Sequence, residues 1–173
     1  TPPAAGSLTL DGVAVAAGDF VTAAEIAAGK LVFAPADHAA GAGYATFTFQ
    51  VEDDGGTDNG GVNLDPTPNT LTINVTAVND APAGADKPVT TPEDVPYPFT
   101  LADFGFTDPH DTPPNALSRV KITTLPANGS LTLNGTPVAA GDFVDAGDIV
   151  LGKLRFEPVA HAVGSPYTTF TFQ

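Results

Sequence analysis

Hydrophobic and polar residues alternate along most of this chain with a period of two, a pattern typical of β-strands with one buried face. The clearest case is Tyr44–Glu52, whose odd-numbered positions from Ala45 to Val51 are apolar while the even-numbered ones are threonine or glutamine. Further strands are predicted at residues 30–33, 70–78, 96–101 and 117–123. Because short strands recur every 8 to 12 residues or so, the pattern predicts an all-β fold.

Two predicted hairpins have sequences suited to tight turns. Asp11-Gly12 and Asn134-Gly135 each interrupt alternating apolar residues, and such pairs tolerate the positive φ angles of a type I′ turn. One short helical turn is expected in each half of the chain. There Thr22 and Asp145 each stand three residues before an acid, which is the spacing of an N-terminal helix cap.

The chain contains one sequence twice. Residues 1–50 and 124–173 align without a gap and are identical at about 32 of 50 positions. The period of 123 residues is too long for a solenoid turn and matches a small domain with its own core. Neither copy is whole, so we expect the chain to be an excerpt of a tandem array. Function then belongs to the array or to the joints between its units.

The segment after residue 78 divides the two copies. It is rich in Pro, Gly and Ala, which resist regular structure, and it predicts a linker at residues 79–84. Residues 1–78 are then the C-terminal part of one repeat, and residues 85–173 are the N-terminal part of the next. The strands favour β-sandwich repeats of immunoglobulin-like size, present as two incomplete copies in tandem. We expect Phe20, Phe33, Phe47 and Phe49 in the core.

Charge and composition narrow the classes of partner. The chain has 20 acidic and 6 basic residues and a formal net charge of −14. Such a field repels nucleic acid and anionic membranes and attracts cations, so we expect no nucleic-acid partner. No apolar run approaches the length of a membrane span, so we expect no direct membrane insertion. The chain has no cysteine, which excludes disulfides and thiolate chemistry.

Four short motifs carry a resemblance to a known family. They are Val51-Glu-Asp-Asp-Gly-Gly56, Val78-Asn-Asp-Ala-Pro82, Pro92-Glu-Asp94 and Phe106-Thr-Asp-Pro-His-Asp111. Together they resemble the cadherin-like tandem repeats of giant bacterial RTX-type surface adhesins, over nearly the whole chain. The resemblance implies a cadherin-like fold, a secreted or cell-surface location, and Ca²⁺ bound at the joints between successive repeats.

The resemblance also implies which residues hold the ion. The linker ligands would be Asn79 and Asp80, and the paired acids of the second repeat would be Asp108 and Asp111. Glu93 would be the acid that reaches the following joint, and Asp53 or Asp54 the acid that serves the preceding joint. Loop carboxylates of this kind supply the hard oxygens that Ca²⁺ prefers, although acids in loops also occur simply as solvated surface.

This sequence departs from the family pattern in two ways that bear on calcium affinity. Asp108-Pro-His-Asp111 has one residue more between its acids than the Asp-x-Asp pair of the family. The residue of the second repeat that corresponds to Asp53 would fall just after Gln173. The joint in this fragment is therefore one group of ligands short. We expect this joint to be empty or only weakly filled with Ca²⁺.

Catalysis finds little support in the sequence, and we expect no enzyme. His38 and His161 occupy equivalent positions after a strand-ending proline, where a hydrogen-bonded turn histidine is favoured over a base. Ser7 and Ser130 lack the surroundings of a nucleophile elbow. Two alternatives remain open: a carbohydrate-binding module, or an accessory β-sandwich module of a secreted protein. Exposed aromatic residues would favour the first, but the chain has three tyrosines and no tryptophan.

The favoured function is a structural spacer repeat of a bacterial extracellular adhesin. Ca²⁺ at the joints would stiffen the array, which would support cell-surface or biofilm adhesion, and its partners would be neighbouring repeats of the same polypeptide. Each incomplete copy lacks strands that the other possesses. Because residues 79–87 reach at most about 30 Å when extended, completion between molecules is favoured, which predicts strand exchange.

Overall fold

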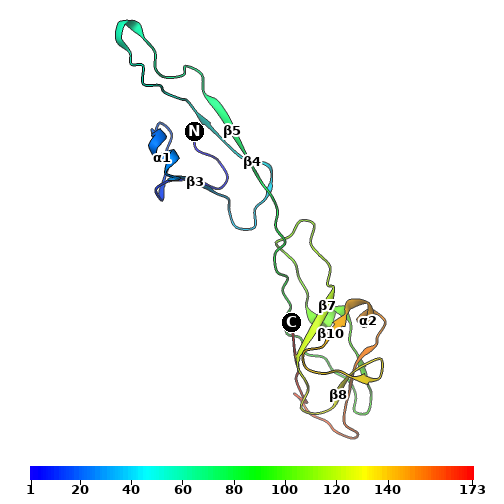
Figure 1. Ribbon diagram of the computed structural model, residues 1–173. Coiled ribbons are helices and arrows are strands. Elements are labelled where there is room, and N and C mark those ends of the chain that lie inside the picture. The colour runs from blue at the N-terminus through cyan, green and yellow to red at the C-terminus, as the bar shows by residue number, and fades with distance from the viewer. The chain divides into compact units, whose positions relative to one another are not determined.

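The computed structural model describes residues 1–173 and divides into two units, Thr1–Asn79 and Asp80–Gln173 (Figure 1). Most of the regular structure is β-strand in several antiparallel sheets, with few and short helices. The all-β prediction is confirmed at this level. The division between the units falls at the start of the segment predicted as a linker. None of the helices has the length and apolar character that crossing a bilayer requires.

Unit 1 has a small sheet and a long hairpin. The sheet has the order β2-β1-β3, and β4 and β5 form the hairpin (Figure 1). The helical elements are one α-helix, α1, and one 3-10 turn, η1. The bounds are β1 Ser7–Leu10, β2 Val13–Ala14, α1 Ala23–Ala27, β3 Leu31–Ala34, β4 Gly41–Phe49, η1 Asp58–Gly60 and β5 Asn69–Val75.

Unit 2 has two sheets whose residues share one core. A three-stranded sheet has the order β10-β7-β12, and a four-stranded sheet has the order β6-β11-β8-β9. The bounds are β6 Tyr97–Pro98, η2 Leu101–Phe104, β7 Arg119–Thr124, β8 Ser130–Leu133, β9 Thr136–Pro137, β10 Phe143–Asp145, α2 Ala146–Val150, β11 Leu154–Glu157 and β12 Thr171–Phe172. Both outer strands of the four-stranded sheet, β6 and β9, end in proline.

The core of unit 2 brings together residues from every one of these layers. Val120 and Ile122 of β7 lie with Leu131 of β8 and Leu154 of β11, and all four are 2% exposed or less. Phe99, Phe104, Val138, Val144 and Ile149 complete the cluster. In unit 1 the buried hydrophobic residue is Ala45. The two units therefore differ in how much apolar surface they remove from water, although much of their sequence is the same.

The predicted hairpin turns form as expected. Asp11 and Gly12 have φ angles of 51° and 82°, and Asn134 and Gly135 have 52° and 79°. The strands on either side of each turn pair in the same register in both units, with Leu10 opposite Val13 in unit 1 and Leu133 opposite Thr136 in unit 2.

The two predicted helix caps have different outcomes. Thr22 forms a full capping box with Glu25, in which the Thr22 side chain accepts from the Glu25 backbone N–H and the Glu25 carboxylate accepts from Thr22. Asp145 forms no side-chain cap, so that prediction is wrong. The reason lies in β10, which runs directly into α2. Asp148 pairs with Lys153 at 2.7 Å instead of reaching back to the cap.

Two other predictions fail in detail. The strand expected at residues 96–101 ends at Pro98, because Thr100 and Asp103 form a capping box that starts η2. Phe49, expected in the core, is 39% exposed, and Phe20, also expected there, is 74% exposed. Its counterpart Phe143 is also exposed, and the Arg119 guanidinium lies 4.2 Å from its ring centroid. The phenylalanine that precedes the short helix is therefore a surface residue in both copies.

Candidate metal site

The predicted acids Asp80, Asp108 and Asp111 come together in unit 2. The main-chain N–H of Asp80 donates to both carboxylate oxygens of Asp111, at 3.3 and 3.2 Å. Asn115 links the two other acids: its backbone N–H donates to Asp108 Oδ2, and its side-chain amide donates to Asp111 Oδ2 at 3.0 Å. We call these four residues the Asp108 network.

Local structure explains why Asp108 is buried. The residue before it, Thr107, forms an antiparallel bridge with Ala83, closed by two hydrogen bonds of 2.8 Å. The bridge draws the chain entering unit 2 across the start of the loop that carries the acids. Asp108 is consequently 6% exposed.

One atom of the network lacks a partner. Asp108 Oδ1 is buried and accepts no hydrogen bond. A buried carboxylate oxygen without a donor costs free energy, on the order of 1–3 kcal/mol or more for a charged group. A cation at this oxygen would remove that cost and would offset the repulsion between neighbouring carboxylates. The network therefore has one buried carboxylate oxygen with which a hard cation could pair.

Glu93 lies elsewhere in unit 2. It belongs to an exposed group with Asp94 and His161, whose potential ligand atoms lie within 4.8 Å of one another. The His161 backbone N–H donates to Asp94 Oδ1 at 2.7 Å, and its Nδ1 is 3.2 Å from Asp94 Oδ2. His161 has a positive φ of 59°, as His38 has of 57°. The group fits the expected hydrogen-bonded turn histidine.

The remaining predicted ligands belong to unit 1. Asp53 and Asp54 are exposed in the loop between β4 and β5, where Asp53 Oδ1 accepts the Gly55 backbone N–H at 3.0 Å. Asn79 is the last residue of that unit and is exposed. Their role as calcium ligands stays a prediction.

Sequence reasoning missed Asn115, the residue that bridges the two central acids. It follows Pro113-Pro114 and stands four residues after Asp111, a position without any strand or helix period. Its role arises from a loop that folds back on the acids. An amide residue soon after two prolines was the only signal available.

The three tyrosines make hydrogen bonds within the fold and do not form an exposed aromatic surface on which a sugar could stack. Tyr44 and Tyr167 each accept a backbone N–H through the hydroxyl, from Ala36 at 3.0 Å and Val159 at 3.3 Å. Tyr97 donates to Asp103, and burial, with the nearby Asp103 carboxylate adding to it, raises the pKa of Tyr97 above its ordinary value. All three rings are half-buried.

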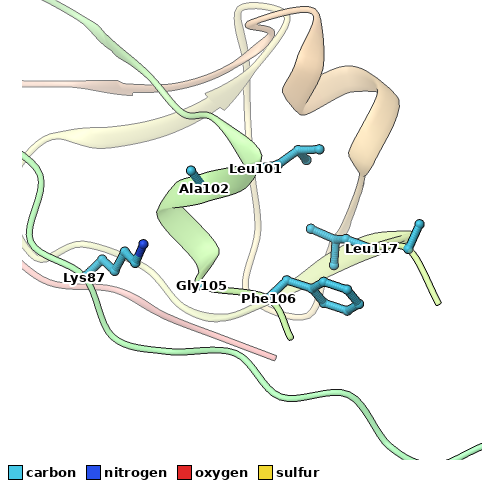
Figure 2. Close-up of a pocket in the computed structure, with 7 residues that line it drawn as sticks. Lys87, Leu101, Ala102, Gly105, Phe106 and Leu117 are labelled. Carbon is cyan, nitrogen blue, oxygen red and sulfur yellow. The ribbon is translucent and has the colours of Figure 1, made fainter. Parts of the chain in front are cut away.

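A shallow pocket of about 360 Å³ lies beside η2 (Figure 2). Its wall is mostly apolar, with Leu101, Phe106 and Leu117, and Lys87 is its one titratable side chain. In the close-up Phe106 and Leu117 lie on one side of the pocket and Lys87 on the other. The other lining residues carry no acid, base or hydroxyl group beside Lys87.

Comparisons with known proteins add no assignment to this geometry. No protein-family model, no curated protein and no solved structure matches the chain.

Proposed function

We propose that the chain is a spacer segment of a bacterial extracellular adhesin, built from immunoglobulin- or cadherin-like β-sandwich repeats that bind Ca²⁺. The observation that carries the calcium proposal is the buried, unpartnered Oδ1 of Asp108 beside Asp80, Asp111 and Asn115. Ca²⁺ takes six to eight oxygen ligands without demanding rigid geometry, which suits a loop of carboxylates and amides.

Three features support a spacer over an enzyme or a lectin. The sequence repeats a whole domain instead of a single site, and its acidic surface suits an extended, soluble array. The three tyrosines, whose hydroxyls could also bind a sugar, are half-buried and are each hydrogen-bonded within their own unit. Ca²⁺ at the joints would remove hinge freedom and hold a terminal binding domain away from the cell.

The proposal is tested by calcium titration of the full chain. Extracellular modules bind with dissociation constants of about 10⁻⁴ to 10⁻³ M. At about 10 mM free Ca²⁺ this stabilises the bound unit by roughly 1.4 to 2.7 kcal/mol. We expect heat on titration and a matching rise in the free energy of unfolding of unit 2, both relative to a chelator-treated sample.

Asp108→Asn keeps the shape of the side chain and removes the charge, so it should abolish the calcium-dependent part of both signals. Asp86→Asn removes the same charge from an exposed residue of the same unit and should leave them intact. Equal responses from the two variants, or no response in the parent chain, would contradict calcium binding at this network.

A further inference from the structure

A polar pocket of about 380 Å³ lies on unit 2 beside the turn that joins β8 to β9. Its wall comes from β8, from this turn, and from the segment that runs from the end of α2 through β11. The Asn134 backbone N–H donates to the Lys153 carbonyl at 3.0 Å, which holds the turn against the start of β11. The pocket is therefore built on two paired strands of the sheet.

The outer side of β11 carries three charged residues that line this pocket. Leu154 is fully buried and Phe156 packs against the core. Because side chains alternate along a strand, Lys153, Arg155 and Glu157 lie on the opposite side, and all three belong to the wall. Two cations and one carboxylate thus face the same small volume.

Of these three residues, only Lys153 has an ion-pair partner in the protein. Its Nζ lies 2.7 Å from Asp148 Oδ1. Arg155 donates through Nε to the Gly152 carbonyl at 3.0 Å, and it forms no ion pair. Glu157 forms none either. The pocket therefore presents one guanidinium and one carboxylate whose charges are not matched within the protein.

A buried hydroxyl in the wall also lacks a partner. Thr132 of β8 stands opposite Arg155 and is 9% exposed, and its Oγ1 makes no hydrogen bond. In unit 1 the equivalent Thr9 donates to the Val32 carbonyl at 3.4 Å. Buried hydroxyls are nearly always hydrogen-bonded, because leaving one unpaired costs free energy. A ligand atom that accepts from Thr132 would remove this cost.

The duplicated sequence changes at this pocket. Arg155 and Glu157 correspond to Val32 and Ala34 in unit 1, although the neighbouring strands β8 and β1 have the same sequence, Ser-Leu-Thr-Leu. Both versions of the strand form the same antiparallel pairing. The fold that the two units share therefore does not require the guanidinium or the carboxylate, and both are special to unit 2.

From these observations we propose that the pocket binds a zwitterion that carries a carboxylate and an ammonium group close together, as a free amino acid does. The planar guanidinium of Arg155 suits bidentate contact with the ligand carboxylate. Glu157 accepts from the ligand ammonium group. Leu151, which is 70% exposed in the wall, offers contact to an aliphatic side chain.

Charge and size favour this class of ligand. The chain has a formal net charge of −14, which repels a simple anion but not a molecule without net charge. Arg155 and Glu157 together also have no net charge, so each charge of a zwitterion meets its opposite. The volume lies within the range of small-molecule sites, roughly 300 to 1,000 Å³.

Titration of the full chain with L-leucine, followed by two-dimensional amide NMR with chelator present, tests the proposal. Two analogues each lack one charged group: isocaproate has no ammonium group, and isoamylamine has no carboxylate. We expect saturable shifts at residues 132–135 and 151–157 and none at the equivalent residues 9–12 and 28–34 of unit 1. Each analogue should bind roughly tenfold more weakly than leucine, because it loses a charge-assisted hydrogen bond.

Three variants locate the binding site. Arg155→Gln and Glu157→Gln should each weaken leucine binding roughly tenfold, and since neither residue belongs to the core, the thermal melting of the variants should match that of the parent. Arg119→Gln removes the other arginine of the chain, which lies on β7 outside this pocket, and should leave binding unchanged.

The absence of saturable shifts with leucine would overturn the proposal. Isocaproate that binds as tightly as leucine would overturn it as well, since the pocket would then recognise an anion alone. So would equal binding by Arg155→Gln and Arg119→Gln. Because chelator is present throughout, each of these results leaves the calcium proposal untouched.

Discussion

The duplicated sequence allows one substitution to be made twice in the same molecule, and Ile26 and Ile149 are the most informative pair. Each is the fourth residue of a five-residue helix, so replacement by alanine changes helix propensity equally. Ile149 is 1% exposed, and truncating a buried isoleucine costs about 2 to 5 kcal/mol. Ile26 is 54% exposed. Since full burial is worth roughly 1.5 to 3 kcal/mol, Ile26→Ala should cost about 1 kcal/mol.

The difference is measured by hydrogen exchange of each unit separately, because a global unfolding signal would mix the two. The experiment is run at low protein concentration, which keeps contacts between molecules to a minimum. Ile149→Ala should lower the protection of unit 2 by the larger amount and leave unit 1 unchanged. Equal losses from the two variants would refute the reasoning, because they would mean that Ile26 is covered within its own molecule.

Three further results are expected. Thr22→Ala removes a formed capping box and should lower the free energy of unfolding by about 0.5 to 2 kcal/mol. Asp145→Ala removes no cap and should lower it little. Chemical denaturation of the two variants measures the difference. The Thr22 hydroxyl and backbone hold the pKa of Glu25 below its ordinary value of 4.5, so that contribution to stability is complete above this value and is lost as the pH falls through the lower folded pKa. Amide exchange in α1 should therefore speed up on acidification, and Glu25→Gln should flatten the dependence. Gly135→Ala strains a positive φ in open space and should lower the free energy of unfolding by about 1 to 2 kcal/mol. Gly129→Ala should lower it more, because its Cβ would lie 2.6 Å from the Glu157 carbonyl oxygen. Denaturation midpoints that fall equally in the two variants would count against the steric argument.

Local features of the fold followed well from sequence, because they depend on neighbouring residues. Alternation located most strands to within a few residues, and the Asp-Gly and Asn-Gly pairs located both hairpins. The capping box at Thr22 formed because its partner stands three residues away with nothing competing for it. At Asp145 the same spacing failed, since a preceding strand and Lys153 decide where those side chains go.

Burial was harder to predict, because it depends on segments distant in the chain. Phe20 looks like a core residue by type, yet it is exposed, and its counterpart is exposed as well. Ile26 and Ile149 occupy the same position of a five-residue helix, yet one is 54% exposed and the other 1% exposed. The candidate site divides in the same way. Its acids stood out in sequence, whereas the bridging Asn115 and the unpartnered oxygen of Asp108 depend on how a loop folds back.

The prolines at both outer strands of the four-stranded sheet have a consequence for aggregation. Pro98 and Pro137 lack the amide N–H that an added strand would need, so lateral growth into amyloid-like ladders is blocked on either side of that sheet. In unit 1 the residue at the position of Pro137 is Ala14, and β3 has no covering strand. Insoluble fibres of this protein would therefore be seeded from its first eighty residues or so.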